Sequence, residues 1–143
     1  MNSIDIKKFG SKIPCFLGCY SLKNLETVNI VKNNVGLIVI NENHAIAIYI
    51  TEKSIDVFDP FGNKNSKVFN PICKFLKLHL PTKILNFSAK IQAEKSNLCA
   101  KFCLVYLKLR CEGISFCEII AYFTTELPHN DLIVTRLFKC LFL

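Results

Sequence analysis

The chain contains three histidines, and one of them stands where a catalytic base would be useful. His79 lies late in a predicted helix, and His129 lies in a Pro-His-Asn-Asp turn. His44 precedes the run AIAIYIT at 45–51, which is typical of a strand because it is rich in β-branched residues. A ring at the mouth of such a strand is held rigidly while staying accessible. An imidazole in that position can take up and return a proton near neutral pH.

A carboxylate follows at the end of the next predicted strand. Residues 54–58 form that strand, and Asp59 ends it before Pro60. A hairpin returns the end of its second strand to the start of its first, so we expect Asp59 beside His44, where it can stabilise an imidazolium. A slip of one residue in the hairpin register would exchange the faces and make Asp56 the acid instead.

A thiol opens a later predicted helix. Cys99 follows Ser96 and Asn97, either of which can cap a helix running to about Cys111. The first turn of a helix carries the positive end of the backbone dipole, which favours the thiolate, the nucleophilic form of cysteine. Cys103 lies one turn deeper and is better explained as a core residue.

A side-chain amide precedes this thiol. Gln92 lies seven positions before Cys99, after the apolar stretch 84–91. Near a nucleophile, such an amide can donate to a developing oxyanion. Taken singly, each residue has an ordinary explanation: a surface histidine, a turn aspartate, a loop glutamine and a buried cysteine. Their order and spacing together favour cysteine-dependent hydrolysis.

In this arrangement the chain resembles the adenovirus protease family, within the wider group that includes the SUMO-type proteases. The family has a His before a strand, an acid in a (Glu/Asp)-Pro-Phe-Gly element, a Gln, and a Cys seven residues later. The matching residues are His44, Asp59-Pro60-Phe61-Gly62, Gln92 and Cys99. The resemblance runs from about residue 13 to 140 and implies that Cys99, His44, Asp59 and Gln92 are catalytic. It further implies an oxyanion hole formed by Gln92 and the Cys99 backbone N–H.

The sequence departs from the family pattern at two positions. The family usually has Trp after the His, where this chain has Ala45, and Gly after the Cys, where it has Ala100. The first change removes a flat wall near the imidazole. The second adds a Cβ beside the nucleophile and narrows substrate access. Both changes concern efficiency and specificity more than identity.

The resemblance implies an α+β, papain-like fold with a central, mainly antiparallel sheet flanked by helices and the nucleophile at a helix N-terminus. It implies a cysteine endopeptidase that cleaves viral capsid or core precursors near glycine, in the host nucleus or cytoplasm and in the virion. An activating viral peptide and DNA are the implied partners, with no metal cofactor. Two alternatives stay open: a protease that removes SUMO- or ubiquitin-like tails, and an inactive protease-like protein with a structural role.

Composition sets wider limits. The 143 residues, 51% of them hydrophobic and 20% charged, predict one protease domain, 1–143, that buries a core without disulfides. The net charge of +7 fits either a solvated lysine surface or attraction to nucleic acid. No apolar run reaches the ~18–20 residues of a membrane span. The eight cysteines lie mostly in apolar segments and lack a zinc-binding spacing, so we expect reduced, buried thiols.

Further elements are predicted from caps and periodicity. They are a helix from Ser21 to Asn33, a strand at 36–40, a helix from an Asn70 cap to Leu78, a strand at 84–88, and helices beginning near Ser115 and after an Asn130-Asp131 cap.

Overall fold

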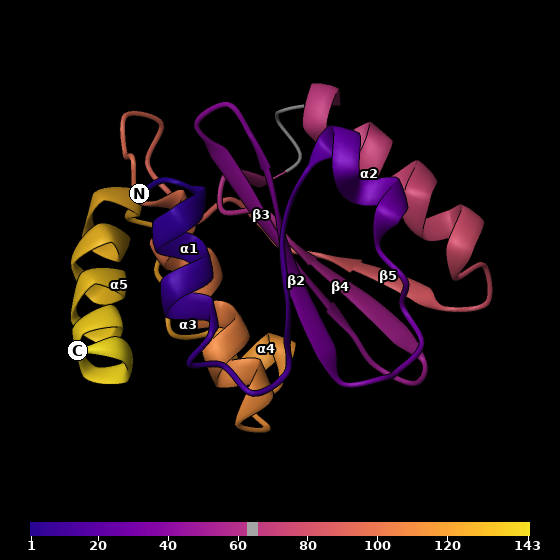
Figure 1. The fold of residues 1–143 in the computed structure, drawn as a ribbon. Coiled ribbons are helices and arrows are strands. Elements are labelled where there is room, and N and C mark those ends of the chain that lie inside the picture. The colour runs from indigo at the N-terminus through magenta and orange to yellow at the C-terminus, as the bar shows by residue number, and fades with distance from the viewer. Residues whose placement is uncertain (63–65) are drawn as a thin grey trace.

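The computed structural model describes residues 1–62 and 66–143, and in that part of the chain it contains one five-stranded mixed sheet between helices (Figure 1). The strands lie side by side in chain order: β1 (Phe16–Ser21), β2 (Val35–Asn41), β3 (His44–Ile50), β4 (Ser54–Phe58) and β5 (Ile84–Phe87). The inner pairs β2·β3 and β3·β4 are antiparallel, whereas the edge pairs β1·β2 and β4·β5 are parallel. The α+β fold is therefore confirmed, with antiparallel pairing confined to the three inner strands.

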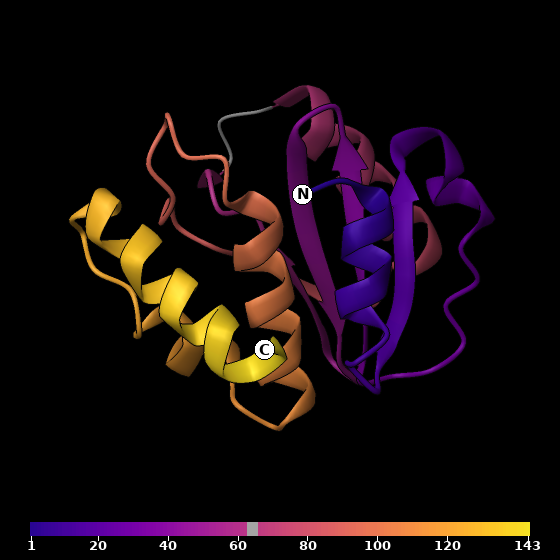
Figure 2. The same ribbon diagram turned by 60° about the vertical axis from the view of Figure 1, so that its left-hand side comes forward.

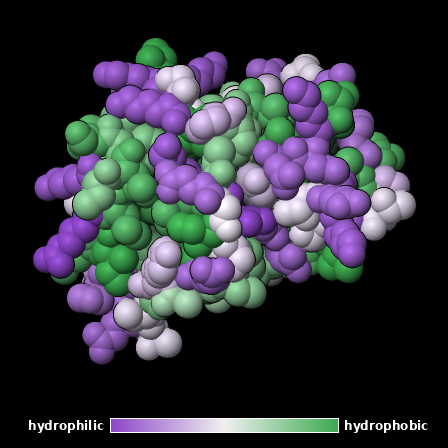
Figure 3. Space-filling view, turned by 90° about the horizontal axis from the view of Figure 1, so that it is seen from below, coloured by the Kyte–Doolittle hydropathy of each residue, from purple (hydrophilic) through white to green (hydrophobic). Residues whose placement is uncertain are grey.

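Helices cover both faces of the sheet, as two views of the ribbon show (Figures 1 and 2). One face carries α1 (Ser3–Gly10), α3 (Cys99–Cys111), α4 (Phe116–Ile120) and α5 (Leu127–Phe142). The opposite face carries α2 (Ser66–His79) and the short 3-10 helix η1 (Leu22–Thr27). Seen from below, hydrophobic side chains gather on the half of the molecule that carries α1, α3 and α5 (Figure 3).

Strand β3 is the centre of this arrangement because all seven of its residues are buried. Alternate side chains enter the two cores: Ala47 and Tyr49 face the core around α3, while Ile46 and Ile48 face the core around α2. A strand buried on both faces needs the continuous apolar run that the sequence shows. The residue at its start, His44, therefore belongs to a strand that is buried along its whole length.

Two predicted helix starts are wrong. Helix α2 begins at Ser66, so Pro71 lies inside it and Asn70 is not its cap. Helix α5 begins at Leu127 after Glu126, with a proline in its first turn, where a missing N–H costs little. Asn130 consequently lies inside α5 instead of capping it.

Near the amino terminus, the helix expected from Ser21 to Asn33 is limited to the 3-10 helix Leu22–Thr27, although Ser21 Oγ caps it as expected by accepting from the Asn24 N–H. Two elements were not predicted. Helix α1 has a capping box between Asn2 and Asp5, and the apolar segment after it forms β1.

The structure also describes the cysteines, possible metal-binding clusters and possible membrane-spanning helices. All eight cysteines are described and carry free thiols; three are buried, three half-buried and two, Cys117 and Cys140, exposed. Within residues 1–62 and 66–143, no cluster of three or more His, Cys, Asp or Glu side chains is placed to hold a metal ion. In the same residues, no helix combines the length and apolar character that crossing a bilayer requires.

Candidate active site

The strand pair β3·β4 brings a histidine and a carboxylate together. His44 is the first residue of β3, and Asp59 directly follows β4, which runs back alongside β3. His44 Nε2 lies 2.9 Å from Asp59 Oδ1, and the side chains are 8% and 1% exposed. The ring N–H does not point along this line, so the contact is a close ion pair rather than an aligned hydrogen bond.

The carboxylate of Asp59 is fixed by its neighbours. Its Oδ1 accepts the Phe61 N–H at 3.0 Å, and the Phe61 ring packs against the His44 ring with centroids 5.1 Å apart. The Asp59 N–H donates to Ser88 Oγ, whose hydroxyl donates back to the Asp59 carbonyl, both at 2.9 Å. Local turn geometry therefore holds the acid against the ring.

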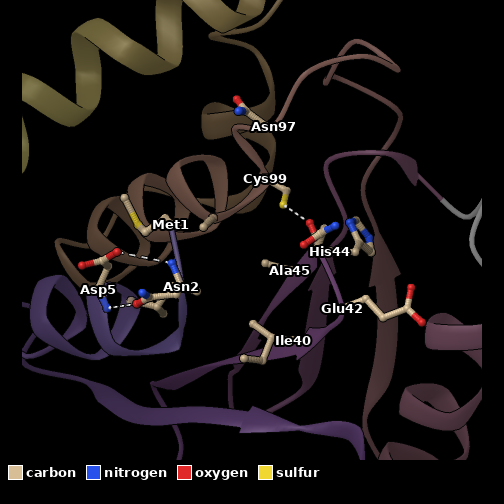
Figure 4. A pocket seen from close by; sticks show the side chains of 12 residues that line it. Met1, Asn2, Asp5, Ile40, Glu42, His44, Ala45, Asn97 and Cys99 are labelled. Atoms are coloured by element: carbon tan, nitrogen blue, oxygen red, sulfur yellow. Dashed lines mark hydrogen bonds between the residues drawn. The ribbon is translucent and has the colours of Figure 1, made fainter.

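The thiol of Cys99 reaches the same place from α3. Cys99 is the first residue of that helix and is 6% exposed, and its Sγ donates to the carbonyl of Asn43 at 3.3 Å (Figure 4). Asn43 directly precedes His44 in the tight turn between β2 and β3. The N-cap residue, Leu98, provides no side-chain cap, contrary to the predicted Ser96 or Asn97 cap. No side-chain cap therefore occupies the first backbone N–H groups of α3, and the positive end of the helix dipole lies beside the sulfur.

The electrostatics of the histidine follow from these contacts. Burial by itself would lower the pKa of His44, but the Asp59 carboxylate and the Cys99 sulfur beside the ring outweigh burial and raise its pKa from 6.5 to about 9. The ring therefore favours the imidazolium form at neutral pH. By contrast, burial raises the pKa of Cys103 well above its usual range, so this thiol stays protonated, donating to the Ala45 carbonyl.

Gln92 lies in the loop before α3 and is fully buried. Its Nε2 donates to the Ser96 carbonyl at 3.0 Å and to Ser96 Oγ at 3.1 Å, while Oε1 has no partner among the described residues. Ser96 Oγ also accepts the Leu98 N–H, at 3.3 Å. Gln92 is thus linked through Ser96 to Leu98, the N-cap residue of α3, and its amide hydrogens are engaged by Ser96.

A cavity of about 600 Å³ opens over the sulfur. Its wall includes Cys99, His44, Asn97 and the two small residues Ala45 and Ala100, whereas Gln92 is not part of it. The rest of the wall comes from Ile40 at the end of β2, from the β2–β3 turn, and from α1 with the two residues before it (Figure 4). Sequence reasoning missed Met1, the α1 cap Asn2, and the α1 residues Asp5 and Ile6. The Asn2/Asp5 capping box could have revealed the helix, but its place beside Cys99 depends on long-range packing.

The alternative acid, Asp56, lies elsewhere. Its Oδ2 is 3.1 Å from the Arg110 guanidinium and accepts from the Tyr106 hydroxyl at 3.2 Å, while its Oδ1 accepts from Asn86. The carboxylate therefore belongs to a buried network against α3. The register puts Asp59, not Asp56, in contact with His44.

Known proteins resemble this chain in fold and not in sequence. No family model and no curated protein match the sequence. Among solved structures, the pS273R protease of ASFV is similar over 99% of this chain and 67% of its own, with a TM-score of 0.70 and 16% identity. The central domain of the uncharacterized Lpg1148 protein from Legionella pneumophila is similar over 99% of this chain and 97% of its own, with a TM-score of 0.60 and 12% identity. This chain therefore has the same fold as the ASFV pS273R protease.

Proposed function

We propose that this chain is a cysteine endopeptidase with Cys99 as nucleophile, His44 as general base and Asp59 as the acid that orients the ring. One observation carries the proposal. His44, which lies 2.9 Å from Asp59, lines the same cavity as Cys99, whose sulfur is held by the carbonyl of the residue before His44. A nucleophile, its base and an orienting acid are the three parts that covalent hydrolysis requires.

The chemistry follows from the ionisation of the pair. In the resting pair, His44 already holds the proton of the Cys99 thiol, and the thiolate attacks the substrate carbonyl carbon. The tetrahedral intermediate collapses when the imidazolium donates that proton to the leaving amine, which breaks the peptide bond and leaves an acyl-thioester and a neutral His44. His44 then takes a proton from water, the resulting hydroxide attacks the thioester, and release of the acid restores the thiolate–imidazolium pair.

The oxyanion requires donors near the sulfur. In the proposal, the backbone N–H of Cys99 and the side-chain amide of Gln92 provide them, and one such donor contributes about 3–4 kcal/mol to transition-state stabilisation. The Gln92 amide must exchange one of its two contacts with Ser96 for the substrate oxygen. Catalytic hydrogen bonds often form only in the substrate complex.

The resemblance noted in the sequence supports viral capsid or core precursors, cut near glycine, as the substrates. It also supports activation by a viral peptide or by DNA. We therefore expect turnover of a glycine-containing precursor peptide to rise when duplex DNA or the activating peptide is added. Faster cleavage of a ubiquitin-like protein after Gly-Gly would instead assign the chain to deconjugation.

The test of the proposal is the alkylation rate of each thiol with iodoacetamide between about pH 4 and 9, read by mass spectrometry. Near pH 6 we expect Cys99 to react at least about tenfold faster than exposed Cys117 and Cys140, because only Cys99 has an imidazolium partner. His44→Ala should remove that advantage. Cys103 is the internal control for an inert buried thiol.

If Cys99 is as unreactive as Cys103 and indifferent to His44→Ala, even with DNA and candidate peptides added, the thiolate–imidazolium pair does not exist. The protease-like fold would then serve a structural or interaction role. Selective alkylation together with cleavage of a peptide panel would establish the peptidase.

A further inference from the structure

One buried side chain outside the catalytic set contacts the segment that carries Gln92. Asn130, in the second turn of α5, is fully buried. Its Nδ2 donates to the carbonyl of Ile91 and to that of Thr124, both at 2.9 Å. Its Oδ1 accepts from the Thr124 N–H at 2.7 Å and from the Thr124 hydroxyl at 3.1 Å. The amide group therefore uses both of its hydrogens and its oxygen.

The bond to Ile91 falls on a particular peptide unit. The Ile91 carbonyl and the Gln92 N–H belong to the same planar group, because the peptide bond has partial double-bond character. Asn130 holds the carbonyl end at 2.9 Å, and the Pro60 carbonyl accepts the N–H end at 2.9 Å. A planar group held at both ends cannot turn about its axis, so the position of the Gln92 Cα, from which its side chain extends, is restrained.

Each of these contacts leads to the catalytic residues. Pro60 directly follows Asp59, which contacts His44. The Gln92 side chain reaches Ser96, which accepts the N–H of Leu98, the residue before Cys99. Asn130 is the member of this set that comes from α5, a helix that otherwise packs on α3 and contributes nothing to the cavity wall.

We propose that Asn130 is a positioning residue for the active site: it fixes the Ile91–Gln92 peptide unit and thereby the place from which the Gln92 amide donates to the oxyanion. The consequence for turnover rests on the proposed function, whereas the clamp on the peptide unit does not. Without the Nδ2 donor, the Ile91 carbonyl would be buried and unpaired, and the peptide unit would reorient to satisfy it.

The test uses Asn130→Asp, which keeps an acceptor for the N–H and hydroxyl of Thr124 but can donate neither to the Ile91 carbonyl nor to the Thr124 carbonyl. The matched control is Thr124→Val, which removes the hydroxyl bond to Asn130 and leaves the bond to Ile91. For a glycine-containing peptide, we expect Asn130→Asp to lower kcat at least ~10-fold, part of the ~10²–10³-fold effect of losing an oxyanion donor, with KM nearly unchanged. Thr124→Val should leave kcat within about threefold.

A double-mutant cycle separates positioning from general damage. In a Gln92→Ala background, Asn130→Asp should lower kcat no further, because its effect passes through Gln92. The pH profile of Cys99 alkylation should be unchanged in Asn130→Asp, since His44 and Asp59 are untouched. Additive losses in the cycle, or an altered alkylation profile, would overturn the positioning role.

Hydrogen exchange tests the clamp without turnover. The Gln92 amide, bonded to Pro60, should exchange at least ~10-fold faster in Asn130→Asp than in the wild type. Unchanged exchange would overturn the clamp whether or not the protein is a peptidase. Faster exchange in a protein with no turnover and no selective Cys99 alkylation would support the clamp and reject the function. If Asn130→Asp does not fold, Asn130→Ser, which is small and uncharged, replaces it.

Discussion

His44 acquires its partners only in the folded chain, which links its protonation to stability. Its pKa is about 9 when folded and close to the ordinary 6.5 when unfolded. A raised folded pKa adds stability that is fully present below about pH 6.5 and is lost as the pH rises to about 9. We expect the free energy of unfolding, measured with urea, to fall across this window.

The matched variant for that measurement is His44→Gln, which fills similar space and does not titrate. The wild-type minus variant difference should decline between pH 6.5 and 9 and be flat from pH 5 to 6. A constant difference across both ranges would mean that the ion pair with Asp59 does not form in solution.

The two buried aspartates, Asp56 in β4 and Asp59 directly after it, should respond differently when each is replaced by asparagine. Asp59→Asn removes the charge that stabilises imidazolium, so Cys99 alkylation near pH 6 should slow at least about tenfold. Asp56→Asn leaves Arg110 without its buried counter-ion and should cost about 3 kcal/mol of unfolding free energy while sparing Cys99 reactivity. Urea denaturation and peptide-resolved alkylation measure the two effects, and the opposite assignment would make Asp56 the acid.

At the scale of elements, the turn Asp59–Gly62 joins the acid to the Gln92 loop. Gly62 has φ +70°, and a Cβ there would lie 3.2 Å from the Lys90 backbone nitrogen. Gly62→Ala should cost about 1–2 kcal/mol of unfolding free energy from backbone strain and also slow Cys99 alkylation by disturbing Asp59. Gly113→Ala is the control, because Gly113 has φ +93° with nothing within 4 Å of its Cβ. Equal alkylation rates in the two variants would show that the turn does not position the acid.

The elements that the sequence revealed best are those with strong local signals. The β-branched runs and the short polar turns predicted β2, β3 and β4. The hairpin pairing of β3 with β4 then placed Asp59 beside His44. Asn130 was misread because its side chain bonds across the fold to Ile91, whereas an isolated Asn-Asp pair is typical of a helix cap. The parallel pairing of β1 with β2 and of β5 with β4 was missed, because parallel neighbours are not joined by a short turn that the sequence would reveal.

For the whole molecule, the net charge of +7 predicts a salt-sensitive attraction to polyanions. We expect binding to duplex DNA to weaken at least ~10-fold between 50 and 200 mM salt, as released counterions lose their entropic advantage. Fluorescence anisotropy of a labelled duplex measures this, with polyglutamate as the matched competitor. If the duplex does not bind at 50 mM salt, the lysines form an ordinary solvated surface and not a DNA-binding one.

The position of α1 has a practical consequence. Met1 and Asn2 stand in the wall of the cavity over Cys99, and α1 runs away from it (Figures 1 and 4). Any residues fused ahead of Met1 would therefore emerge at the mouth of the cavity, where they would obstruct access to Cys99. Residues fused after Leu143 would emerge at the opposite end of α5 (Figure 1). An affinity tag for purification accordingly belongs at the carboxyl terminus, because a tag at the amino terminus would lie over the cavity that contains Cys99.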